Sequence, residues 1–411
     1  MKCAIGIFLS LIFSTVALAL QQTYPDYSDQ VPDGYTGKKF HLSQNYPQAL
    51  PTLDRPWEKI DFMTNPDQYL ESIKRYIYEG MREANWEVDN NSVRKWYHVP
   101  WMHVGRSPRE FVHGMTRERT SNPGELGPGQ TERVQNWAVG FYNEYGGYTV
   151  GQVWKDPSSP NPSAARFPIG TVVAKILFTA ATVEQVPELA GTVEWEANIN
   201  STTDRNSPKK IQKIRLLQMD FGVRDPRANV TTGWVFGTFV YDNRVTGKDG
   251  WDKMVPVGLM WGNDPKVTPT NVVEGAKLAE SYLNTNMPAF AMARLGWGGR
   301  LNGPVDNSES SCLSCHSTAQ WKPTREDMTP TGTEQERLHW FRNLKPDEAF
   351  TSGELSLDYS LQFAVSIQNF HNPSLNPAIS PTILRFNVRP LKENRNQEQI
   401  ELFDLGYPVM R

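Results

Sequence analysis

Cysteine is scarce in this chain of 411 residues, which contains three: Cys3, Cys312 and Cys315. Cys3 lies in an N-terminal segment that we expect to be removed, so two cysteines remain in the mature protein. These two are separated by two residues, and no other cysteine remains with which either could pair. A network of structural disulfides is therefore excluded as a source of stability.

The chain also has no strong excess of charge, no internal repeat and no low-complexity tract. It has 42 basic and 45 acidic residues, a net charge of −3, which becomes −4 when Lys2 is removed. This mild balance argues against nucleic acid or an anionic membrane surface as a partner. Thirty prolines, thirty glycines and thirteen tryptophans indicate a loop-rich globular protein. The length of the mature chain predicts about two or three structural units.

The N-terminus carries an apolar run that is short for a membrane span. Within residues 1–19, the single basic residue Lys2 is followed by apolar residues that end in the small-residue pattern Ala17-Leu18-Ala19. This arrangement predicts a secretory signal peptide, and an N-terminal membrane anchor is the alternative. We expect a periplasmic or secreted protein with no integral membrane span after the signal is removed.

The two remaining cysteines belong to the pentapeptide Cys312-Leu313-Ser314-Cys315-His316. This pattern is typical of c-type haem attachment, because two thiols on one helical turn can form thioethers to the two vinyl groups of one porphyrin. His316 is then placed to be an axial ligand of the iron. The pattern predicts one covalently attached haem c per chain. Dithiol redox chemistry, a zinc site and a chance occurrence are the alternatives.

The fold class predicted from the pattern of apolar residues is α+β, with a central antiparallel sheet and flanking helices. β-branched runs at 171–178, 213–221, 233–241 and 255–261 predict strands, and their short connections favour antiparallel pairing. Helices are expected at 65–84, 134–142, about 271–284, 333–344 and 355–370. We expect three regions: an N-terminal arm and helical region at 20–130, a β-rich region at 131–320 that ends in the haem motif, and a C-terminal helical region at 321–411.

Residues 96–119 concentrate histidine, arginine and tryptophan. His98, His103 and His113 lie there, as do the arginines at 106, 109, 117 and 119. These residues predict one wall of a haem pocket, with arginines paired to the haem propionates. A folded loop with ordinary ion pairs is the alternative. No catalytic residue can be named from the sequence.

A sixth iron ligand would come from elsewhere in the chain. His371 is our first candidate because it follows a helix that is expected to be buried, and His339, Met328 and Met287 are the others. A strong sixth ligand would leave outer-sphere electron transfer, whereas an open position would permit ligand binding or substrate oxidation.

Residues 135–320 resemble the cytochrome P460 group, in addition to the general resemblance of 312–316 to c-type cytochromes. The similar segments are 167–175, which resembles the strand opening of that group, and the Gly/Trp-rich segment 233–237, followed by Cys312-Leu313-Ser314-Cys315-His316. The resemblance implies a small antiparallel sheet ahead of the haem motif. Members of the group carry a lysine cross-linked to the haem and oxidise hydroxylamine, and relatives without the cross-link bind small gases. Lys175 is the residue to examine, although the specific activity is not carried over.

Three functions follow from these patterns. The first is an exported mono-haem c-type cytochrome that transfers one electron at a time to or from a redox partner protein. The second is a haem-dependent oxidoreductase or small-ligand-binding protein with an open distal site, which the length of the chain favours. The third is a binding or scaffold module in which haem senses redox state.

Overall fold

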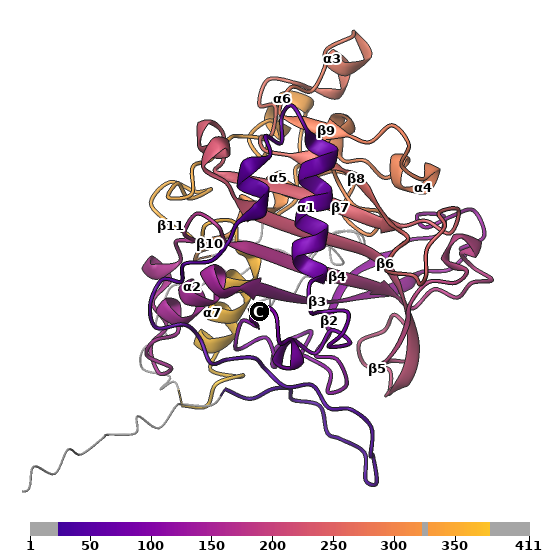
Figure 1. The fold of residues 1–411 in the computed structure, drawn as a ribbon, viewed down its shortest axis with the longest axis vertical. Helices are drawn as coiled ribbons and strands as arrows, with labels where there is room; N and C mark the ends of the chain where they lie inside the picture. Colours follow the sequence, from indigo (N-terminus) through magenta and orange to yellow (C-terminus); the bar gives the residue numbers. More distant parts are fainter. Residues whose placement is uncertain (1–23, 323–327, 379–411) are drawn as a thin grey trace, which may run out of the picture.

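The computed structural model describes residues 24–322 and 328–378, and its main feature is a large antiparallel sheet (Figure 1). The path of the sheet is β1-β3-β4-β6-β7-β8-β9; β2 also pairs with β3, and β5 pairs with β6. Its strands are β1 (Trp96–Tyr97), β2 (Thr116–Ser121), β3 (Val134–Asn143), β4 (Val172–Thr179), β5 (Glu194–Asn200), β6 (Lys209–Arg224), β7 (Trp234–Tyr241), β8 (Met254–Met260) and β9 (Ser281–Leu283). A second, two-stranded sheet pairs β10 (Gln320–Trp321) with β11 (Leu355–Ser356). The predicted α+β class and the antiparallel pairing are therefore confirmed.

The helices are short compared with the sheet. They are α1 (Pro66–Tyr78), α2 (Glu144–Val153), α3 (Pro269–Val273), α4 (Ala289–Met292), α5 (Cys312–His316), α6 (Glu334–Arg337) and α7 (Leu361–His371). Single 3₁₀ turns occupy Pro56–Lys59, Val88–Asn90, Pro162–Ala164, Pro187–Leu189, Pro226–Val230 and Trp297–Gly299. None of the helices in the described part of the chain has the length and apolar composition that crossing a membrane requires.

The two faces of the sheet carry separate apolar cores. α1 lies across one face (Figure 1), where its buried residues Leu70, Ile73 and Ile77 pack on the strands. The opposite face is covered by apolar residues of α2, α5 and α7. Because side chains alternate along a strand, neighbouring residues of β4 are sent to different faces. Ala174 and Ile176 therefore join the core under α1, whereas Lys175 lies on the opposite face.

The helix expected at 134–142 is wrong: these residues form β3. All ten residues of β3 are buried, because the strand pairs with β1, β2 and β4 and has a core on each face. A strand covered on both faces loses the alternation that marks strands in a sequence, and its apolar run cannot be told from a helix by periodicity. Gly146 and Gly147, which follow this segment, lie inside α2.

Other predicted helices begin where helices are found in the structure, but the observed helices are shorter than predicted. The helix expected at 65–84 ends at Tyr78, and Gly80 follows with φ +74°, a conformation that commonly ends helices. The helix expected at 333–344 begins with a capping box of Thr333 and Glu336, but it has four residues. The stretch 271–284 contains the end of α3 and the strand β9 instead of one helix. Within 355–370 the chain first forms β11 and then α7, which begins after the N-cap Ser360.

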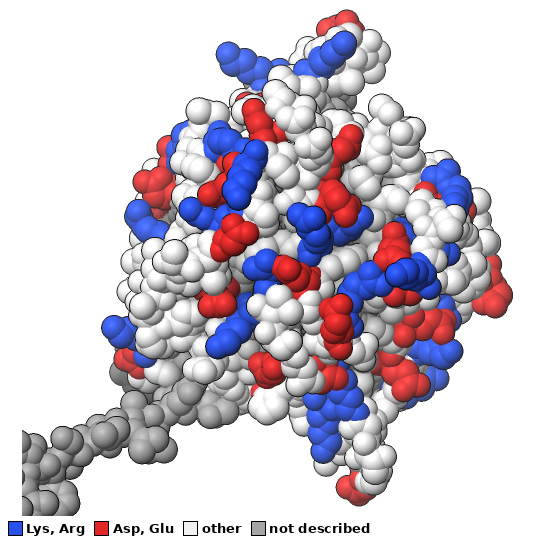
Figure 2. Space-filling model, in the orientation of Figure 1, with Lys and Arg blue, Asp and Glu red and all other residues white. Residues whose placement is uncertain are grey.

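The expected region boundaries do not coincide with breaks in the sheet. The boundary at 130 falls between β2 and β3, which are paired with each other. The signal peptide expected at 1–19 and the end of the chain beyond 378 lie outside the described residues. On the face shown in Figure 2, basic and acidic side chains are interspersed, as the mild net charge leads one to expect.

Candidate functional site

The Cys-x-x-Cys-His pentapeptide forms the short helix α5 at the wall of a cavity. Ser311 caps this helix: its Oγ accepts a hydrogen bond from Ser314 N (3.1 Å), and Ser314 Oγ accepts one from Ser311 N (2.8 Å). This reciprocal capping satisfies two amides that the start of a helix otherwise leaves without partners. It also fixes the turn that carries both thiols and the imidazole.

Cys312, Cys315 and His316 all line one cavity, which is partly open to solvent and has a volume of about 170 Å³. Aromatic rings form part of its wall: Tyr142 stacks on Phe167 with ring centroids 5.2 Å apart and planes inclined by 4°. The cavity wall therefore offers flat aromatic surfaces against which a planar ligand can pack.

His316 is held from the side opposite its free nitrogen. Its Nδ1 lies 2.9 Å from the backbone carbonyl oxygen of Tyr359, and the ring of Phe236 packs against it at 4.8 Å between centroids. Burial lowers the pKa of His316 to about 4, so the imidazole is neutral at neutral pH. A neutral imidazole with one nitrogen bonded to a carbonyl and the other available is the form in which histidine binds metals.

The loop that supplies this carbonyl is conformationally strained. Tyr359 has a φ of +66°, which L-residues other than Asn and Asp seldom adopt, and the preceding Asp358, a residue that tolerates this region, has a φ of +47°. The carboxylate of Asp358 holds the loop by accepting hydrogen bonds from Trp234 Nε1 (2.7 Å) and from the backbone N of Phe167 (2.6 Å). Burial raises the pKa of this carboxyl to about 6.

The two thiols form no disulfide and are partly buried. Burial raises the pKa of Cys315 to about 12 and that of Cys312 well above its usual value. Reactive dithiols instead have a lowered pKa and belong to a βαβ unit. Here the sheet is antiparallel and a loop precedes the motif. These features argue against dithiol redox chemistry.

Lys175, which was singled out from the sequence, lies in this cavity with the haem motif. Its Nζ is 3.6 Å from Glu118 Oε2 on β2 and 3.9 Å from Asp220 Oδ2 on β6. Burial alone would lower the pKa of Lys175, but the charges of Glu118, Asp306 and Asp220 outweigh burial and raise it. Lys175 is therefore a protonated, ion-paired amine.

The expected sixth ligands lie in different places. His371 is not among the described residues that line the cavity: it is at the end of α7, where it stacks on Trp321 with ring centroids 5.0 Å apart. His339 packs against Phe350 at 4.8 Å. Met328 lines the cavity, as does Met102, which the sequence analysis did not consider as a ligand. The geometry thus gives the proposed role of His371 no support and turns attention to methionine.

The histidines of 96–119 are separated from the cavity. His98 is buried, and its Nδ1 accepts a hydrogen bond from Ser43 N (3.1 Å). His113 stacks on Trp195 with ring centroids 4.4 Å apart, and its Nδ1 contacts the carbonyl oxygen of Glu196 at 2.8 Å. These two histidines, and His103, are not among the described residues that line the cavity.

The arginines of the same segment do line the cavity, as the sequence predicted for a pocket wall. They are Arg106, Arg109, Arg117 and Arg119. Arg109 is buried and donates hydrogen bonds to the carbonyl oxygens of Gly114 (2.8 Å) and Val99 (3.3 Å). Its Nε and the Nη1 of Arg106 are buried and have no hydrogen-bond partner among the described residues.

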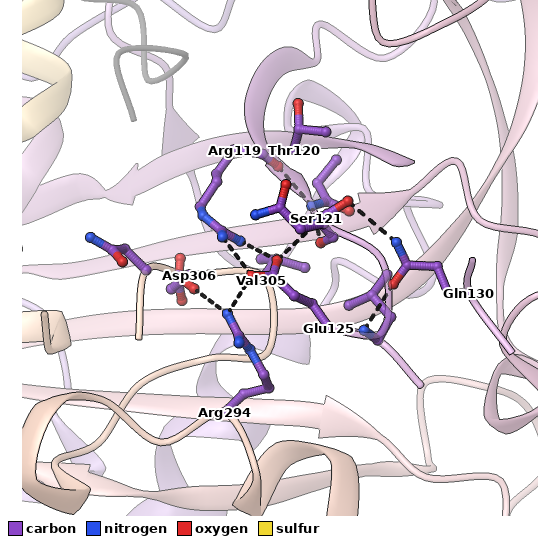
Figure 3. A network of polar contacts seen from close by, with 12 residues as sticks. Arg119, Thr120, Ser121, Glu125, Gln130, Arg294, Val305 and Asp306 are labelled. Carbon is purple, nitrogen blue, oxygen red and sulfur yellow. Dashed lines mark hydrogen bonds and ion pairs between the residues drawn. The ribbon is translucent and has the colours of Figure 1, made fainter. Parts of the chain in front are cut away.

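A network of hydrogen bonds and ion pairs around Glu125 includes Arg119 and Asp306, which line the cavity (Figure 3). Both ends of the Glu125 carboxylate accept hydrogen bonds from Arg119, at 2.6 and 2.7 Å, and Arg294 Nη2 lies 3.1 Å from the same carboxylate. Arg294 also reaches the carbonyl oxygen of Asp306 at 3.5 Å. The network joins β2 to the loop that leads into the haem motif.

Sequence reasoning missed four acidic residues and one carbonyl group of this site. The residues are Glu118, Asp220, Asp306 and Asp358, and the carbonyl is that of Tyr359. An aspartate among the apolar residues in the second half of β6, as Asp220 is, was the one available signal. Within residues 24–322 and 328–378, no three His, Cys, Asp or Glu side chains are grouped so as to hold a metal ion, which argues against a zinc site there. Comparisons with known protein families, with curated proteins and with solved structures found no match to this chain.

Proposed function

We propose that this chain is an exported, mono-haem c-type cytochrome that carries one haem c on Cys312 and Cys315, with His316 as the axial ligand. The observation that carries the proposal is that both thiols and the imidazole line one cavity, with His316 Nδ1 bonded to a carbonyl oxygen. The donor set therefore fits the group. Two free thiols can form thioethers, and a neutral imidazole has its second nitrogen available for iron.

When bound, haem c supplies one-electron chemistry at its iron. The residues of the chain hold and orient it. Tyr359 fixes the imidazole ring through its carbonyl group, and Phe236 packs on that ring. Arg106 and Arg109 offer N–H groups without partners among the described residues, and we assign these groups to the haem propionates, because guanidinium groups pair with carboxylates in charge-assisted hydrogen bonds.

One-electron transfer with an external redox partner is the first candidate function. A second candidate, a haem-dependent oxidoreductase or small-ligand-binding protein, is favoured by the composition of the cavity wall. Among the described residues, His316 is the one histidine that lines the cavity, while the polar residues Lys175, Asp220 and Gln362 face the same space. A cavity that holds such polar side chains and no second histidine among its described lining residues is suited to an exchangeable ligand on the distal side. The P460-like resemblance and Lys175 belong to this second candidate.

The test is the visible absorption spectrum of the full chain, expressed with a haem-attachment system, in the ferric and ferrous states with and without carbon monoxide. Haem that stays with the polypeptide under denaturing conditions is expected for the wild type. It should be lost in the Cys312→Ser/Cys315→Ser variant. A wild-type chain without covalent haem would overturn the proposal. Low-spin ferrous bands that carbon monoxide leaves unchanged would select electron transfer. A shift with carbon monoxide would select the open site.

A further inference from the structure

A group of partly buried carboxyls lies in the same cavity and has no role in holding haem. Glu118 on β2, Asp220 on β6 and Asp306 in the loop before α5 come together around the single amine of Lys175 on β4. If all three carboxyls were ionised, the four groups would have a net charge of −2. Burial makes such an excess of like charge costly, so the group is poised to hold a proton.

Two of the carboxyls are joined through one amide. Gln218 Nε2 lies 2.8 and 2.9 Å from the two oxygens of Asp220, and 2.8 Å from Asp306 Oδ2. One NH₂ group therefore serves two carboxylates. Burial first, and the charge of Asp306 second, raise the pKa of Asp220 to about 7. Burial also raises the pKa of Glu118.

This group is connected to the haem-attachment turn. Thr238 Oγ1 donates a hydrogen bond to Asp220 Oδ1 (2.8 Å) and lies 3.9 Å from Cys312 Sγ. The charge of Lys175 also lowers the pKa values of Cys315 and His316, after the larger effect of burial on each. Charge changes at the turn and at the carboxyls therefore influence each other through a medium of low dielectric constant.

We propose that the carboxyl of Asp220, which lies beside the charge of Asp306, takes up one proton from water when the protein receives one electron at its haem. The inference rests on the proposed function. An external one-electron donor would supply the electron to bound haem c, while an O–H bond forms between a solvent-derived proton and a carboxylate oxygen of Asp220. The net charge of the cavity is then unchanged. By linkage, the electron and the proton each favour the uptake of the other to the same extent.

The experiment is a potentiometric titration of the haem-loaded protein at several pH values around neutrality. The reduction potential of the wild type is expected to fall as pH rises, by up to a tenfold change in the redox equilibrium per pH unit, or about 59 mV. Asp220→Asn should flatten this dependence. Asp33→Asn, at an exposed site, is the matched control and should behave as the wild type does. Profiles for Asp220→Asn and the wild type that superimpose would overturn the inference.

A second measurement does not depend on the folding of a variant. The infrared difference spectrum between reduced and oxidised wild-type protein, recorded in H₂O and in D₂O, is expected to show a protonated carboxyl band that is gained on reduction. A spectrum without such a band would overturn the inference, while covalent haem in the same sample would leave the proposed function standing. A sample without covalent haem would overturn both.

Discussion

The Nδ1 atom of His316 lies 2.9 Å from the carbonyl oxygen of Tyr359, although 43 residues separate them in the chain. This contact fixes the imidazole and leaves Nε2 as its available nitrogen. The carbonyl is presented by a backbone at positive φ, a conformation that costs about 1–3 kcal/mol per residue and is maintained by surrounding contacts. Asp358 provides two of these contacts, and the hydroxyl of Tyr359 provides a third by donating to the carbonyl oxygen of Leu344 (2.7 Å).

Asp358→Ala is expected to lower the free energy of unfolding by about 2–5 kcal/mol, because it leaves two buried N–H groups, on Trp234 and Phe167, without an acceptor. Urea denaturation measures this loss. Asp358→Asn keeps one acceptor oxygen and a residue that tolerates positive φ, so its loss should be smaller. An Ala variant as stable as the wild type would contradict the role that we give to this carboxylate.

His371→Ala is expected to leave the ferrous spectrum and its response to carbon monoxide unchanged, because His371 stacks on Trp321 and does not line the cavity. Met328→Ala and Met102→Ala are the informative comparisons, since both thioethers line the cavity. If either variant gains carbon monoxide binding that the wild type lacks, that methionine is the sixth ligand. A spectrum altered by His371→Ala and by neither methionine variant would restore the original choice.

The stability of the protein in mild acid should depend on buried histidines. Burial lowers the pKa of His103 and of His113 to about 4, and that of His98 well below its usual value. The unfolded chain therefore binds more protons than the folded one between about pH 4 and 6.5, and each histidine makes stability rise with pH there. His103→Phe should reduce the slope of unfolding free energy against pH by about 1.4 kcal/mol per pH unit. Denaturation at pH 4.5, 5.5 and 6.5 measures the slope, and a slope equal to that of the wild type would contradict the assignment.

Asp220 has the opposite effect on the pH dependence of stability, because its pKa is raised in the folded protein. Its folded-state pKa is raised to about 7, so between about pH 4 and 7 the folded protein holds a proton that the unfolded chain releases. Stability from this group is thus greatest at low pH and falls as pH rises through that window. Asp220→Asn should remove this fall and make the protein more stable relative to the wild type at pH 7.5 than at pH 5. A difference that does not vary with pH would count against a shifted carboxyl at this position.

The polar network around Glu125 should contribute more to the stability of the protein than an exposed ion pair does (Figure 3). Glu125, Arg119 and Arg294 have side chains that are 13–15% exposed. Glu125→Ala removes the carboxylate that both arginines contact, and it is expected to lower the free energy of unfolding by about 2–4 kcal/mol. Glu71→Ala is the matched control: Glu71 is 66% exposed and pairs with Lys74, and its loss should cost less than about 1 kcal/mol. Equal losses in the two variants would show that burial does not strengthen the network.

Much of the fold could be predicted because it depends on local patterns. The runs at 171–178, 233–241 and 255–261 are β4, β7 and β8 almost residue for residue, since β-branched and aromatic residues with short connections leave few alternatives. β3 could not be predicted, because both of its faces are buried and its sequence carries no alternation. The short helices after the haem motif were overestimated for a related reason: apolar spacing marks buried positions, whichever backbone conformation carries them.

The sequence by itself determined the local chemistry: two thiols and an imidazole on one helical turn, with Lys175 on a strand of an antiparallel sheet. Only the tertiary structure decided what surrounds them. The packing of distant segments places the carbonyl of Tyr359 against His316 and the carboxyls of Asp220 and Asp306 in the cavity. It also places His371 away from the described cavity wall. The relative positions of residues within a short motif can be predicted because the residues are close neighbours in the chain. The partners of that motif are chosen by sheet register and loop packing, which no short stretch of sequence contains.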